Sequence, residues 1–71
     1  MTHGQELDYM AGALLLPLEP VYELLESYRY RELAPKDRLR VVDLICREYG
    51  VERWLAFRRI REIYVIMAMH P

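Results

Sequence analysis

Cysteine and histidine are scarce in this sequence of 71 residues. The single Cys46 cannot form a disulfide within the chain, so a reducing compartment is its natural environment, and we expect the cytoplasm. The two histidines, His3 and His70, stand at opposite ends of the sequence. The HExxH motif, which places two zinc-binding histidines one helical turn apart, is therefore missing. We expect no complete metal site, no cofactor and no catalytic activity.

Long apolar runs and a basic, apolar leader are also missing. The two longest apolar stretches, residues 13–18 and 63–69, are far shorter than the roughly 20 residues that span a bilayer. The N-terminal sequence MTHGQELD does not have the composition of a secretory signal. We therefore expect a soluble protein without a membrane partner.

Apolar residues, by contrast, make up 54% of the chain, and six tyrosines add partly apolar surface. A domain of this size buries only about 60% of the surface that its unfolded chain exposes. The apolar excess favours contact with other chains, so we expect a protein partner and a homodimer. The alternative is that the most apolar side chains belong to the domain's own core. The candidate protein-contact residues are Tyr22, Tyr28, Tyr30, Met67 and Met69.

Charge is divided unevenly between the two halves of the chain. Residues 1–35 hold two basic and six acidic side chains, whereas residues 36–71 hold eight basic and five acidic ones. This division permits a basic face in the C-terminal half, although an excess of this size is also typical of an ordinary solvated surface.

Helical periodicity dominates the sequence, without strand alternation, internal repeats or low-complexity segments. With Pro17 as a helix stop and Pro20 and Pro35 as helix starts, the spacing predicts a single all-α domain over residues 1–71. Gly50 is the expected C-terminal cap of the third helix, because glycine readily adopts the left-handed conformation. The four expected helices cover residues 5–16, 20–30, 36–49 and 52–66.

Each expected helix carries one apolar stripe that should face the core. The spacing within these stripes identifies the side chains that we expect to be buried. They are Leu14, Leu15, Leu24, Val42, Ile45 and Ile60.

The connection between the third and fourth expected helices is similar to that of a helix-turn-helix motif. Cys46 stands four residues before Gly50, where such motifs carry a small side chain, and the next helix follows almost at once. The second helix of such a pair presents its exposed residues to the major groove of DNA. Helices that cross at a glycine turn are also common in proteins that never contact DNA. The candidate DNA-binding residues are Arg53, Trp54, Arg58, Arg59 and Arg61.

The order ELDYMAGALLLPLEPVYELLE, a basic linker and LICREYGVERWLAFRRIREI resembles the C-terminal part of the ImmA/IrrE family of zinc-dependent peptidases. The resemblance covers about residues 5–63, with an LLxP helix followed by a region like a helix-turn-helix. In that family the glutamate that opens the LLxP helix completes a zinc site with two histidines of a preceding HExxH helix, and Glu6 matches it. Because HExxH is missing here, we instead expect Glu6 to stabilise its helix, since a negative charge at the N-terminus of a helix interacts favourably with the helix dipole.

Three functions are compatible with these observations. The first is a non-catalytic regulatory or binding module that acts by protein contact, and the resemblance implies a role in phage or mobile-element regulation. The second is a helix-turn-helix DNA-binding transcriptional regulator. The third is a fragment or subunit of a zinc-dependent peptidase, in which Glu6 would serve a separate chain that carries HExxH.

Overall fold

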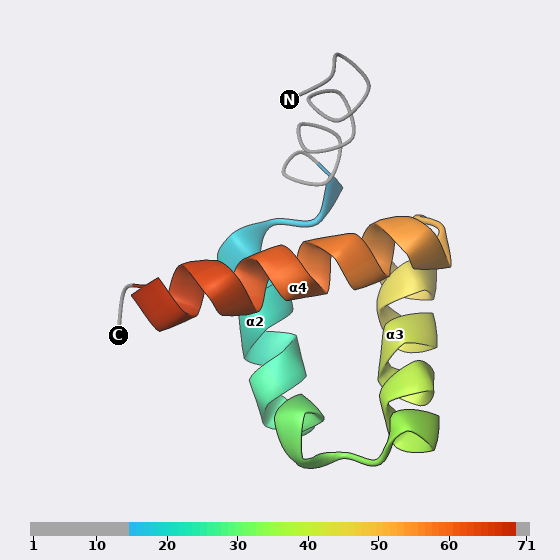
Figure 1. The fold of residues 1–71 in the computed structure, drawn as a ribbon. Helices are drawn as coiled ribbons and strands as arrows, with labels where there is room; N and C mark the ends of the chain where they lie inside the picture. The colour runs from blue at the N-terminus through green and yellow to red at the C-terminus, as the bar shows by residue number, and fades with distance from the viewer. Residues whose placement is uncertain (1–14, 70–71) are drawn as a thin grey trace.

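The computed structural model describes residues 15–69, and this part of the chain is all-α, without a strand. Its elements are α2 (Leu18–Ser27), the short 3₁₀ helix η1 (Tyr30–Glu32), α3 (Pro35–Tyr49) and α4 (Arg53–Met69). α2 and α3 run in opposite directions, and α4 lies across both of them (Figure 1). The expected all-α class is confirmed for these residues, whereas the expected helix over residues 5–16 lies almost wholly outside them.

α2 begins two residues earlier and ends three residues earlier than the sequence predicts. Pro17 occupies the position before the helix, and Pro20 lies in the first turn, where its missing amide is not needed. The helix cannot continue through Arg29, which adopts a left-handed conformation with a φ of 55°. η1 follows directly, so the expected linker of residues 29–35 contains one short helical turn.

α3 ends at Gly50, as the sequence predicts. Gly50 has a φ of 65°, and the N–H of Val51 donates a hydrogen bond to the carbonyl of Cys46 at 3.2 Å. A Cβ at position 50 would have no atom within 4 Å, so the positive φ rather than a lack of space explains the glycine. Only Val51 and Glu52 separate this cap from α4, which is why the two helices cross closely.

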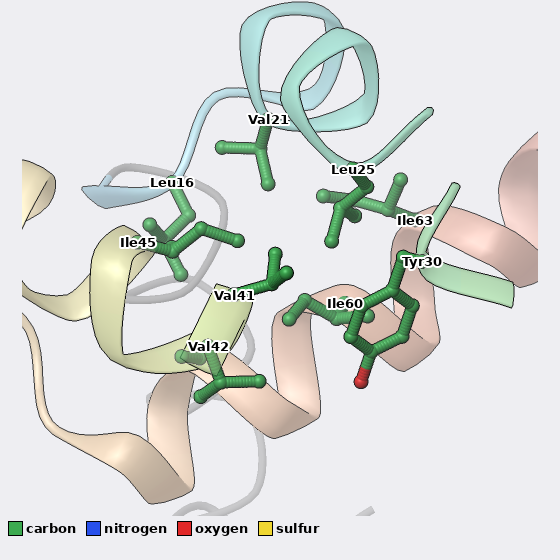
Figure 2. Close-up of a cluster of buried hydrophobic side chains, with 10 residues drawn as sticks. Leu16, Val21, Leu25, Tyr30, Val41, Val42, Ile45, Ile60 and Ile63 are labelled. Carbon is green, nitrogen blue, oxygen red and sulfur yellow. The ribbon is translucent and has the colours of Figure 1, made fainter. Parts of the chain in front are cut away.

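The core forms where α2, η1 and α3 meet α4, and Figure 2 shows side chains from all four elements converging there. Val42, Ile45 and Ile60 are buried as expected, and Leu24 is half-buried at the edge of the core. The buried apolar residues of the described chain are Leu16, Val21, Leu25, Tyr30, Val41, Val42, Ile45, Leu55, Ala56, Ile60 and Ile63.

The sequence-based assignment of Leu15 to the core is wrong, because this side chain is 49% exposed. The neighbouring Leu16 is fully buried instead. The chain bends at Leu16, since Pro17 disfavours helical geometry in the residue before it, and the helical spacing no longer applies there. Leu14, also expected in the core, lies outside the described residues.

Candidate functional site

α4 carries apolar residues on two opposite sides. One side packs into the core, where Ala56 and Ile63 are fully buried, while on the other side Phe57 is 43% and Val65 is 53% exposed. The outer side of a surface helix is usually polar, so contiguous exposed apolar residues indicate an interaction surface. We call this side the outer face of α4; its exposed residues are Trp54, Phe57, Arg58, Arg61, Val65, Ala68 and Met69.

A groove of about 620 Å³ lies between α4 and η1, at the edge of this outer face. Its floor includes the buried Tyr30 and Ile60, and its rim includes the exposed Phe57 and Val65. Arg61 is the charged residue among the described residues that line it. The groove is therefore apolar in its centre and basic at its edge.

Three tyrosines pack together beside the groove, and two of them, Tyr30 and Tyr64, line it. The ring of Tyr64 is stacked on that of Tyr30, with centroids 6.0 Å apart, and Tyr22 meets it edge-on at 6.1 Å. The guanidinium of Arg31 lies 5.4 Å from the centroid of the Tyr64 ring and pairs with Glu26 at 2.9 Å. Tyr22 is half-buried and Tyr30 is buried, so both contribute to the packing beneath the surface.

Arg38 of α3 holds η1 in position through two of its backbone carbonyls. Its Nε donates a hydrogen bond to the carbonyl of Tyr30 at 3.1 Å, and its terminal nitrogen donates to the carbonyl of Arg31 at 2.7 Å. The same guanidinium lies 5.2 Å from the centroid of the Tyr30 ring. These contacts satisfy two backbone carbonyls of a very short helix and so fix the floor of the groove.

The tyrosine cluster should make the free energy of unfolding fall at high pH. Burial raises the pKa of Tyr64 from 10.0 to about 12, and the charge of Glu26 adds to this effect. Because the folded state holds this proton more tightly than the unfolded state, the resulting stabilisation is complete below pH 10.0 and is lost as the pH rises to about 12. Denaturant unfolding at several pH values across this interval measures the loss. Tyr64→Phe removes the titrating hydroxyl and should lose less stability; equal losses would contradict the prediction.

Arg59 is an interior residue, and this placement contradicts its expected role as a DNA contact. It is only 5% exposed, and its Nε donates a hydrogen bond to the carbonyl of Leu16 at 2.9 Å. One terminal nitrogen lies 3.9 Å from a carboxylate oxygen of Glu62. Leu16 lies 43 residues before Arg59 in the sequence, so helical periodicity could not reveal this hydrogen bond. The periodicity placed Arg59 at the edge of the exposed side instead.

The other candidate DNA-binding residues are exposed, but they differ in their contacts within the protein. Arg53 is engaged by α3, because it donates hydrogen bonds of 2.8 and 3.0 Å to the two carboxylate oxygens of Asp43. Trp54, Arg58 and Arg61 share the outer face of α4, and the guanidinium of Arg58 lies 6.0 Å from the Trp54 ring centroid. The structure therefore brings three of the five candidates together.

The remaining protein-contact candidates are dispersed. Tyr28 is exposed beside a separate hollow on α3, Met67 packs against the core, and Met69 is exposed at the end of the outer face. Phe57 and Val65, which are central to the outer face, were not identified from the sequence. Their spacing of about two helical turns is the signal that could have revealed a second apolar stripe on the same helix.

Residues 15–69 contain neither a group of metal-binding side chains nor a helix that could span a membrane. No three histidine, cysteine, aspartate or glutamate side chains in this range are grouped so that they could hold a metal ion. His3, Glu6 and His70 lie outside it. None of the helices in the same range is long and apolar enough to cross a membrane. The expectations about zinc and catalysis stay predictions.

The resemblance to ImmA/IrrE peptidases also stays a prediction. We infer function from the outer face of α4. No protein-family model matches the chain, and no match was found among curated proteins or solved structures.

Proposed function

We propose that this chain is a non-catalytic regulatory module that acts by protein contact through the outer face of α4. The observation that carries this proposal is that α4 exposes Trp54, Phe57 and Val65 beside Arg58 and Arg61, although its opposite side already fills the core. Aromatic and arginine side chains are enriched at protein interfaces and supply most of their binding energy. A role in phage or mobile-element regulation, implied by the resemblance to ImmA/IrrE proteins, belongs to the same proposal.

A helix-turn-helix DNA-binding protein explains this face less well. The connection from α3 through Gly50 to α4 is of the kind that such motifs use. However, Phe57 and Val65 occupy the exposed side of the second helix, where DNA recognition needs contacts to phosphates and polar base edges. Arg53 is in addition paired with Asp43. Protein contact accounts for the apolar residues as well as the arginines.

Replacing Phe57 with aspartate should reduce capture of the protein partner by about tenfold or more, because a charge would then enter the apolar part of the contact. The measurement is quantitative affinity capture from native cell extract, with and without nuclease. Leu39→Asp is the matched control, because Leu39 of α3 is also apolar and 41% exposed but lies outside the outer face. Melting curves of both variants should show that they fold.

Two outcomes of this experiment would contradict the proposal. Equal capture by the Phe57 and Leu39 variants would mean that the outer face of α4 is not the contact surface. Capture that disappears after nuclease treatment would mean that nucleic acid bridges the proteins, and would favour the DNA-binding alternative.

A further inference from the structure

We propose that the groove between α4 and η1 binds an amphipathic helix of the partner protein, with apolar side chains flanked by carboxylates. The inference rests on the proposed function, because it names the chemistry of the protein that contacts the outer face of α4. It follows from the shape of the groove, from its charge and from the poor fit of a second copy of this chain.

The shape of the groove suits a helix. The residues of α4 that line it extend from Phe57 to Ala68, which corresponds to about 16 Å of helix or three turns. An amphipathic helix places apolar side chains along one stripe of this length and binds grooves through them. A peptide bound by strand addition would need the edge of a sheet to pair with, and residues 15–69 form no strand.

The charge of the groove selects a partner with carboxylates. Arg61 lines the groove and is exposed, and it forms no hydrogen bond or ion pair within the described chain. Arg58 is exposed on the same face of α4, and none of the described residues that line the groove is acidic. A carboxylate on the docked helix would therefore meet a guanidinium that still has its donors available, while Glu62, which lines the neighbouring hollow with Arg58 and Arg61, is only partly exposed.

A second copy of this chain fits the groove poorly. In a twofold contact with its axis at Arg61, this arginine would face its own counterpart, because residues near the axis meet themselves. Opposed like charges disfavour such a contact. We therefore assign the groove to a different protein, and the homodimer expected from the composition is not assigned to it.

Two synthetic helical peptides test the proposal. Both carry the same leucine stripe, which is flanked by glutamates in one peptide and by lysines in the other. Fluorescence anisotropy of each labelled peptide, titrated with the full chain, should show that the acidic peptide binds about tenfold or more tightly than the basic one. Arg61→Glu should remove or reverse this preference, whereas Leu39→Asp should preserve it. Phe57→Asp should abolish binding of both peptides.

Several results would overturn the inference. Equal affinities for the two peptides, a preference that is unchanged in Arg61→Glu, or failure of both peptides to bind would each do so. Self-association in sedimentation velocity that is lost in Phe57→Asp but kept in Leu39→Asp would assign the groove to a second copy.

The outcomes also separate this inference from the proposed function. If Phe57→Asp still lowers capture from extract while the peptides show no charge preference, the inference fails and the protein-contact function stands. If Phe57→Asp changes neither capture nor peptide binding, both fail.

Discussion

Replacement of Arg59 by alanine should destabilise the fold by about 3 to 5 kcal/mol, the cost typical of removing one partner from a buried charged pair. The side chain is nearly inaccessible, donates to the carbonyl of Leu16 at 2.9 Å and lies 3.9 Å from the carboxylate of Glu62. Alanine would leave that carbonyl without its hydrogen-bond donor and that carboxylate without its nearby cation in the interior. A domain of this size is stable by only about 5 to 10 kcal/mol, so the variant should keep a small margin and melt at a much lower temperature.

Thermal and denaturant melts followed by circular dichroism measure this effect. Arg61→Ala is the matched control, because this arginine lies on the exposed side of the same helix and should leave the melting temperature close to that of the wild type. Replacing Arg59 with methionine and Glu62 with leucine together should recover part of the stability, since no unpaired charge is left buried while the carbonyl of Leu16 still lacks its donor. Coincident melts of Arg59→Ala and Arg61→Ala would show that Arg59 has no structural role.

This result would also govern how binding experiments are interpreted. Loss of DNA or protein binding in Arg59→Ala would report unfolding and not a lost contact, because the side chain is not at the surface. Variants of Arg61 avoid this ambiguity, since that side chain is exposed.

Leu25→Ala should cost about 2 to 5 kcal/mol, through lost burial of the side chain and the cavity left behind. Leu25 is fully buried where α2 meets the other elements of the core, as Figure 2 shows. The same substitution at Leu15, which is exposed, should cost far less, because it leaves no internal cavity.

The pair of variants forms a direct comparison, since both remove the same atoms from a leucine. Chemical denaturation of both variants, fitted with the same dependence of unfolding free energy on denaturant concentration, gives the difference in unfolding free energy. A similar cost at the two positions would mean that Leu15 is buried, as helical periodicity predicted. It would also show that the bend at Leu16 does not determine which leucine is buried.

Local signals in the sequence explain why some helix ends were predicted well. α3 begins one residue earlier than expected, at Pro35, and ends before Gly50, because proline and glycine limit the backbone at these positions. The end of α2 had no such signal. Arg29 is left-handed there, a conformation that arginine rarely adopts, so the sequence predicted three more residues of helix.

The candidate site was predicted only in part, because helical spacing does not reveal contacts with distant parts of the chain. The sequence placed Arg58, Arg59 and Arg61 on one helix and treated them as neighbours on its exposed side. Spacing alone puts Arg59 near the edge of that side, and the donation of its hydrogen bond to Leu16 depends on how α4 crosses the chain before α2. Phe57 and Val65 were overlooked because one apolar stripe had already been assigned to the same helix.

The all-α class of residues 15–69 and the helix end at Gly50 were determined by the sequence alone, because they depend on interactions within a few residues. Only the tertiary structure decided that Arg59 lies in the interior beside Ile60. That placement depends on what the rest of the chain presents to α4, because the carbonyl of Leu16 accepts the hydrogen bond of Arg59. Packing buried Ile60 and Ile63 and left Phe57 exposed beside the groove, because the core has room for only one side of the helix.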